Sequence, residues 1–239
     1  SVTDMEMLRC CHVFEHQQAL VVAHRTESTE ILFENIRRAW KAMPDSVRPA
    51  NRYSSKRMLH FKDNDSRIEV SVAGETRGFT AQMLHVSELA FVEGAGALMT
   101  AIMQTVPDTI DSLVILQSTP NGVGNEFHNL WVAACKPGGN EWIPVFIPWF
   151  EEPTYCAKKA KITAEELEAR QDDAAIRAKE IVRLHGVSME QISWWLSTLE
   201  NKCFGDLDRM EQEYASDPQS CFLASGRRVF DRDGIKHYA

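Results

Sequence analysis

The sequence predicts an α/β protein with a mainly parallel sheet, followed by a smaller helical region. Buried-strand patterns alternate with helical patterns up to about residue 150, and only helical patterns follow Tyr155. Strands that alternate with helices are typical of a parallel sheet joined by crossover helices. We therefore expect a core domain over residues 1–155, a helical region over 156–225, and the start of a linker over 226–239.

The first elements follow from apolar spacing and from residues that begin or end helices. Apolar residues at helical spacing predict a helix over 2–14, and a β-branched run predicts a buried strand over 18–24. Thr26 or Ser28 suits the cap of the next helix. That helix continues to about Met43 on one apolar face and ends at Pro44.

The following stretches carry the alternation to residue 150. Two prolines in the last of them predict an edge strand or an irregular one. In chain order we expect a hairpin of 57–62 and 67–72 with one wet face, a buried strand over 82–88, a helix over 94–106, a strongly buried strand over 112–119, a helix over 125–135 and a strand over 142–150.

Helical patterns fill the rest of the chain. A charged helix is expected over 163–183, because Thr163 and Glu166 form a capping-box pattern at its start. A second helix with two adjacent tryptophans is expected over 188–201, and a third, short one over about 206–213.

Composition indicates a globular protein with a sizeable core. The 239 residues are 44% hydrophobic and 25% charged, which suits one large domain, or one domain with an appendage. No apolar run approaches the ~20 residues that span a bilayer, and the first residues do not resemble a signal peptide. Six scattered cysteines without a CxxC pair favour reduced core thiols of a cytosolic protein over a disulfide framework or a zinc site.

The net charge of −8 argues against a nucleic-acid surface over the whole chain but leaves room for a local one. Basic residues cluster at Arg37-Arg38-Lys41, at Lys158-Lys159-Lys161 and at Arg227-Arg228. Each cluster suits a solvated face as well as a phosphate contact.

Glu88 is the first candidate functional residue. It ends the short apolar run 82–88, which is bounded by turn signals and predicts a buried strand of a parallel sheet. Ligands bind at the carboxyl ends of the strands in open α/β sheets. The alternative is that Glu88 only caps the helix that follows near Leu89.

Several pieces of the chain, taken in order, resemble one family. They are Leu20–His24, Glu75–Thr80, Met83–Glu88, Gln117–Gly122 with Asn125–Phe127, Pro148–Tyr155, and pieces of the run from Glu213 to Asp231. Together they look like the ATPase portion of a tailed-phage large terminase subunit, the DNA-packaging motor. The resemblance implies a RecA-like P-loop ATPase core, a helical lid region and, in the full protein, a nuclease domain.

The resemblance also implies ATP and Mg²⁺ as cofactors and a role for each motif residue. Glu88 would end the Walker B strand and orient the water that attacks the γ-phosphate. Ser87 stands where many P-loop proteins carry the magnesium-linked Asp, so it would reach the metal only through water. Arg77 would serve as an arginine finger, with a structural salt bridge as the alternative.

Gln117, Ser118 and Thr119 fall where the family has its coupling motif. Hydroxyls at that strand end would sense the γ-phosphate and report hydrolysis to the rest of the motor. The alternative is an ordinary Thr-Pro-Asn-Gly turn at a strand end.

The partners implied by the resemblance are double-stranded DNA, the terminase small subunit, the portal protein and further copies of the chain in a ring on the procapsid. The host cytoplasm is the implied location. Two other functions stay open: a non-catalytic assembly module with a decayed P-loop fold, and a RecA-like helicase, which should carry a second RecA-like domain.

A Gly-rich phosphate loop with its lysine does not occur in the sequence. The family places that loop just before the first helix, so it is expected immediately before Ser1, which would be its last, magnesium-binding hydroxyl residue. We expect residues 1–239 alone to bind ATP weakly and to turn it over negligibly. Phosphate release by the purified 239-residue chain tests this, and clear turnover would contradict it.

Overall fold

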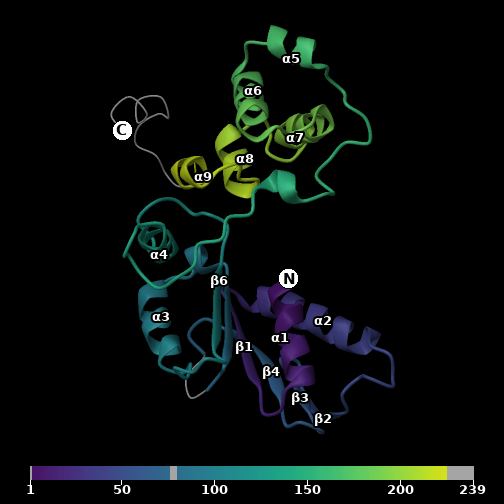
Figure 1. Ribbon diagram of the computed structural model, residues 1–239, viewed down its shortest axis with the longest axis vertical. Helices are drawn as coiled ribbons and strands as arrows, with labels where there is room; N and C mark the ends of the chain where they lie inside the picture. Colours follow the sequence, from purple (N-terminus) through teal and green to yellow (C-terminus); the bar gives the residue numbers. More distant parts are fainter. Residues whose placement is uncertain (1, 76–79, 225–239) are drawn as a thin grey trace. The chain divides into compact units, whose positions relative to one another are not determined.

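The computed structural model describes residues 2–75 and 80–224, and the chain divides into two compact units at Ser118–Thr119 (Figure 1). The first unit holds the sheet, and among the described residues after it there are helices and no strand. The predicted class, α/β with a mainly parallel sheet followed by helices, is thereby confirmed. The predicted domain boundary at residue 155 stays a prediction.

The sheet has six strands in the order β2-β3-β4-β1-β5-β6. They are β1 (Gln18–Ala23), β2 (Asn51–Ser54), β3 (Met58–Phe61), β4 (Arg67–Val72), β5 (Met83–Ser87) and β6 (Leu113–Gln117). Strands β4, β1, β5 and β6 pair in parallel, and β2 and β3 add an antiparallel edge. The carboxyl ends of the four parallel strands therefore lie along one edge of the sheet.

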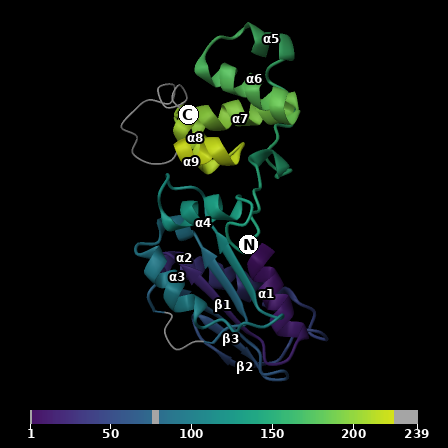
Figure 2. The same cartoon turned by 60° about the vertical axis from the view of Figure 1, so that its left-hand side comes forward.

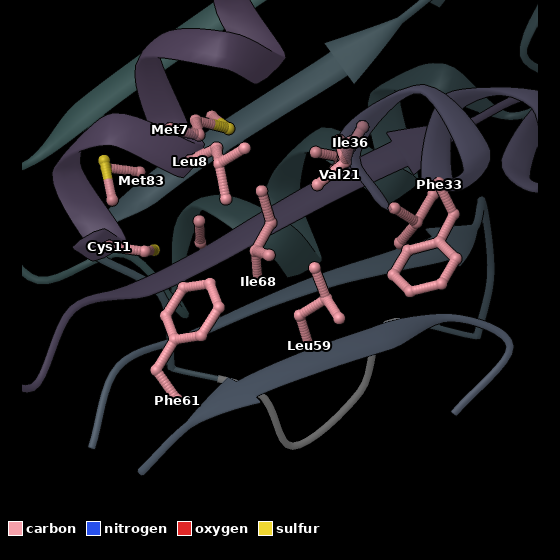
Figure 3. Packing of buried hydrophobic residues seen from close by; sticks show 12 residues of the cluster. Met7, Leu8, Cys11, Val21, Phe33, Ile36, Leu59, Phe61, Ile68 and Met83 are labelled. Atoms are coloured by element: carbon pink, nitrogen blue, oxygen red, sulfur yellow. The ribbon is translucent and has the colours of Figure 1, made fainter. Parts of the chain in front are cut away.

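Helices α1 (Val2–Val13) and α2 (Thr26–Ala42) lie together against one face of the sheet (Figure 1). Met7, Leu8 and Cys11 of α1 meet Phe33 and Ile36 of α2 over the strands (Figure 3). All five side chains are at most 3% exposed. Burying one such Leu or Ile stabilises the fold by roughly 1.5–3 kcal/mol, so this cluster anchors both helices to the sheet.

The remaining elements of the first unit are a single turn, η1 (Leu89–Phe91), and α3 (Ala95–Met103). Helix α3 buries Leu98, Met99 and Ile102. The second unit holds α4 (Glu126–Ala134), η2 (Trp149–Glu151), α5 (Ala164–Ala169), α6 (Asp173–His185), α7 (Met189–Asn201), α8 (Leu207–Glu213) and α9 (Pro218–Ala224).

Two expected strands differ in the structure. Residues 142–148 form no strand, since Pro144 and Pro148 remove ladder donors, and Ile143 there is 86% exposed. Strand β6 forms but is not strongly buried, because it is the last strand in the described sheet order and its five residues are exposed or half-buried.

Two helix predictions were also wrong in detail. The single helix expected over 163–183 is two helices, because Asp172 accepts a hydrogen bond from the Ala175 backbone N–H and begins α6. The position before α2 is held by Arg25 with no side-chain cap, so neither Thr26 nor Ser28 caps it. Strand β2 and helix α9 were not expected.

The helical unit has its own core. Figure 2 shows α6 and α7 close together, and Ile181, Ile192 and the fully buried Trp195 belong to one apolar cluster there. Gly186 ends α6 at φ 65°, a conformation that favours glycine. Aromatic rings add specific contacts, with Tyr155 stacked on Trp194 at 4.4 Å between ring centroids.

A buried ionic cluster joins α6 to α8 and to the residue before α9. Arg177 donates to both carboxylate oxygens of Glu211, at 2.6 and 3.1 Å, and to Asp217 at 2.9 Å. Glu211 is fully buried. Burial by itself raises the pKa of Asp217, but hydrogen bonds from Ser220 and Arg177 outweigh it and hold that pKa below its usual range.

No helix among the described residues is both long and apolar enough to cross a bilayer. All six cysteines are free thiols. Cys11, Cys203 and Cys221 are buried, as expected for core thiols, whereas Cys135 and Cys156 are exposed and do not match that expectation.

The ionic cluster gives a stability prediction. Arg177→Met leaves Glu211 buried without its main partner and should lower the free energy of unfolding by about 3–5 kcal/mol at pH 7. The matched control Arg183→Met, exposed on the same helix, should change it by less than about 0.5 kcal/mol. Urea unfolding measures both.

The contribution of Asp217 to this cluster should depend on pH. Its pKa is lowered by folding, so its stabilisation is present above the unfolded-state pKa and is lost as pH falls through the folded-state value. The difference between the wild type and Arg177→Met should therefore narrow in acid, and a difference that widened as pH fell would contradict the role of this carboxylate.

Candidate functional site

The candidate site lies at the carboxyl ends of β5 and β6. These strands pair in parallel with Ser87 opposite Gln117. Because the pairing is in register up to the last residue of each strand, the next residues, Glu88 and Ser118, leave the sheet side by side. This edge is where open parallel sheets bind their ligands.

Glu88 is held in an unusual backbone conformation, with φ 58° and ψ 44°. This left-handed region costs a non-glycine residue roughly 1–2 kcal/mol. Such strain is typical of residues that a functional site holds in place. The structure contradicts the alternative that the Glu88 carboxylate caps the next turn, since it makes no capping hydrogen bond to η1.

Ser118 takes the capping role instead. Its Oγ accepts a hydrogen bond from the Ala90 backbone N–H at 3.1 Å, and it donates to Oε2 of Glu88 at 3.4 Å. One hydroxyl therefore fixes both the turn after β5 and the carboxylate at its start.

A buried polar chain lies directly beneath this edge. His85, in the middle of β5, places Nδ1 2.9 Å from Oδ1 of Asp4 and Nε2 3.2 Å from Oε1 of Gln117. The side chains of Asp4 and His85 are both 0% exposed. Burial is the largest single influence and raises the pKa of Asp4, but the hydrogen bond to His85 and the other favourable interactions of this carboxylate together hold that pKa below its usual range.

The structure brings four of the sequence-predicted residues to one place. Ser87 and Gln117 are the last residues of β5 and β6, and Glu88 and Ser118 follow them directly. Thr119 is the first residue of the second unit. Arg77 and Ser1 lie outside the residues that the structure describes, so their predicted roles stay predictions.

Sequence reasoning missed three polar residues. The signal for His85 was available, because it is the one ionisable residue inside an apolar strand run. Asp4 gave no comparable signal, since acidic residues are ordinary in the first turn of a helix. His24, which follows β1, has a buried Nδ1 without a hydrogen-bond partner among the described residues, and its ring lies 6.3 Å from that of Phe91.

The carboxyl ends of β5 and β6 present side-chain oxygen atoms that could serve as metal ligands. Among the described residues, no group of three or more His, Cys, Asp or Glu side chains could hold a metal ion. The hydroxyls of Ser87 and Ser118 and the Glu88 carboxylate are oxygen donors of the type that Mg²⁺ accepts. Mg²⁺ usually keeps several waters and takes few protein ligands, so this donor set fits it through water or beside a phosphate.

One basic cluster lies beside an aromatic ring. Lys158, Lys159 and Lys161 line an open hollow with Trp194. The Nζ of Lys202 lies 5.9 Å from the centre of the same ring. These residues all belong to the second unit.

Comparison with known proteins gives one family of structures. The ATPase domain of the Thermus phage P74-26 large terminase matches with a TM-score of 0.48 and 15% identity, covering 90% of this chain and 81% of that one. The bacteriophage HK97 large terminase matches at 0.45 and 17%, covering 75% and 40%. The large terminase of the thermophilic bacteriophage D6E, in complex with ADP, matches at 0.44 and 11%, covering 56% and 33%.

The chain thus spans a third of the length of the D6E protein and two fifths of the HK97 protein. No protein-family model matches the chain.

The strained backbone at Glu88 gives a stability prediction. Glu88→Ala and Glu88→Gly remove the same carboxylate, but only glycine relaxes the left-handed conformation. The glycine variant should be more stable by about 1 kcal/mol. Glu93 is not among the positive-φ residues. There the alanine variant should be more stable than the glycine variant. Urea unfolding of the four variants checks this, and an alanine variant as stable as the glycine variant at position 88 would contradict the strain.

Proposed function

We propose that this chain is the ATPase motor portion of a viral large terminase subunit, which couples ATP hydrolysis to packaging of double-stranded DNA into a procapsid. The observation that carries the proposal is the Glu88 carboxylate, which follows an interior parallel strand and is contacted by Ser118, the residue after the neighbouring strand. The ordered set of motifs that resembles large terminases supports it.

In the proposed reaction Glu88 orients the attacking water and accepts its proton. The water oxygen bonds to the γ-phosphorus as the bond from that phosphorus to the β,γ-bridging oxygen breaks, which gives ADP and inorganic phosphate. Bound Mg²⁺ neutralises phosphate charge. Ser118 holds the carboxylate, and the left-handed backbone at Glu88 fixes the direction from which it approaches the water.

Gln117, Ser118 and Thr119 are proposed to couple hydrolysis to movement. Ser118 contacts Glu88, and the chain passes from the first unit to the second at the next peptide bond. A shift of Ser118 when the γ-phosphate leaves would therefore be transmitted covalently to the helical unit. Ser87 is proposed to meet the metal through water, Arg77 to act as an arginine finger on a neighbouring subunit's nucleotide, and Ser1 to contribute a metal-binding hydroxyl.

The proposed partners are double-stranded DNA, the small terminase subunit, the portal protein and further copies of the chain in a ring, in the cytoplasm of a bacterial host. The lysine cluster beside Trp194 is a candidate for phosphate contacts.

Two other functions are less well supported. A RecA-like helicase would need a second sheet domain, and the described residues after β6 form helices without strands. A non-catalytic assembly module is favoured by Ser87 in place of an acidic residue. That hypothesis gives no reason for a glutamate to be strained beside Ser118, where any residue tolerant of the left-handed region would serve.

The test is Glu88→Ala in the full-length protein. DNA-stimulated ATP turnover should fall by about a hundredfold or more, because a general base contributes roughly 10²–10⁴. ATP affinity and the unfolding transition should change little. Glu93→Ala, an exposed carboxylate five residues on, is the matched control and should keep wild-type turnover. Unchanged turnover in Glu88→Ala would remove the assignment of Glu88 and favour the assembly module.

A further inference from the structure

Three elements of the first unit are joined by the buried chain Asp4–His85–Gln117. Asp4 belongs to α1, His85 to β5 and Gln117 to the last position of β6. The two contacts measure 2.9 and 3.2 Å. Burying polar groups is unfavourable unless they are paired, so a fully buried Asp and His are maintained here only through such contacts.

The apolar core does not require a histidine at position 85. Side chains of a strand alternate between its faces, so His85 faces the same way as Met83, which belongs to the apolar cluster under α1. An aliphatic residue would satisfy such a position. What an aliphatic residue lacks is the pair of ring nitrogens, on two sides of a rigid ring, that reach α1 and β6 at the same time.

The chemistry of the partners fixes the orientation of this ring. A carboxylate only accepts hydrogen bonds, so the Nδ1 that faces Asp4 carries a proton. The ring is thereby held with Nε2 3.2 Å from the side-chain oxygen of Gln117, a contact that is a hydrogen bond when Nε2 also carries a proton or when the amide is turned so that its nitrogen donates. Gln117 is followed by Ser118, whose hydroxyl contacts Glu88. Two side-chain contacts, the peptide link from Gln117 to Ser118 and one hydrogen bond therefore connect α1 to the Glu88 carboxylate.

We propose that His85 is a positioning residue. Through Asp4 and Gln117 it ties α1 to the end of β6 and so sets where Ser118 holds the Glu88 carboxylate. This inference rests on the proposed function, in which Glu88 is the catalytic carboxylate. The contacts give a route from α1 to that carboxylate that is separate from the backbone of β5.

The test asks whether Asp4 and Gln117 act on each other through His85. In the full-length protein, Asp4→Asn, Gln117→Ala and the double variant form a cycle, which is repeated in the His85→Phe background. DNA-stimulated kcat, the KM for ATP and the urea-unfolding free energy are measured for each variant.

With His85 present, the kcat of the double variant should differ by at least about fivefold from the value expected if the two single effects were independent. The KM for ATP should stay nearly constant. In the His85→Phe background the same two substitutions should have additive effects. His85→Gln, which reaches only one of the two partners, should also remove the coupling, and it replaces His85→Phe if that variant does not fold. Glu6→Gln, another α1 carboxylate that pairs with Arg9, is the matched control and should be additive with Gln117→Ala.

Additive effects in kcat with His85 present would overturn the inference. So would non-additivity that persists in both position-85 backgrounds. A merely structural role would appear as coupling in the unfolding free energy without coupling in kcat, and that result also overturns it. Failure of the proposed function can be told apart from failure of this inference. It appears as unchanged ATP turnover in Glu88→Ala, whatever the result of the double-variant cycle.

Discussion

The candidate site depends on the in-register parallel pairing of β5 with β6. Ser87 lies opposite Gln117, so Glu88 and Ser118 are the first residues beyond the ladder on adjacent strands. A slip of one residue would move every side chain of β6 to the opposite face and separate the hydroxyl from the carboxylate. The register is specified by the side chains that β5 buries, which are the apolar Met83, Leu84 and Val86 together with His85. The same register therefore buries the side chains of the sheet and places Glu88 beside Ser118.

Two unfavourable features coincide at this edge, and the same neighbours offset both. Glu88 occupies the left-handed region, and Asp4 and His85 are buried ionisable groups. The turn after Glu88 is fixed by the Ser118 hydroxyl, and the buried pair is satisfied by its own hydrogen bonds and by Gln117. Residues 117 and 118 thus support both features from a strand that is itself exposed or half-buried. The helical unit is stabilised differently, by an apolar core with the Arg177–Glu211 pair inside it.

Much of the fold could be predicted because local patterns agree with it. The apolar runs of β1 and β5, the hairpin of β3 and β4, and the capping box at Thr163 each indicated an element that the structure contains. The failures have physical causes. An apolar run with two prolines did not become a strand, and a capping aspartate divided one expected helix into two. The burial of β6 depends on its place at the end of the sheet order, which periodicity does not contain.

By itself the sequence determined that a strand would end at Glu88 and another near Gln117-Ser118, because apolar runs and turn residues are local signals. Only the tertiary structure decided that these ends are neighbours, that Glu88 is strained and its carboxylate makes no capping hydrogen bond, and that His85 joins Asp4 to Gln117. Those contacts link residues 30 to 81 positions apart. Their geometry comes from the strand order and from the packing of α1 on the sheet, neither of which is encoded in any short stretch of the chain.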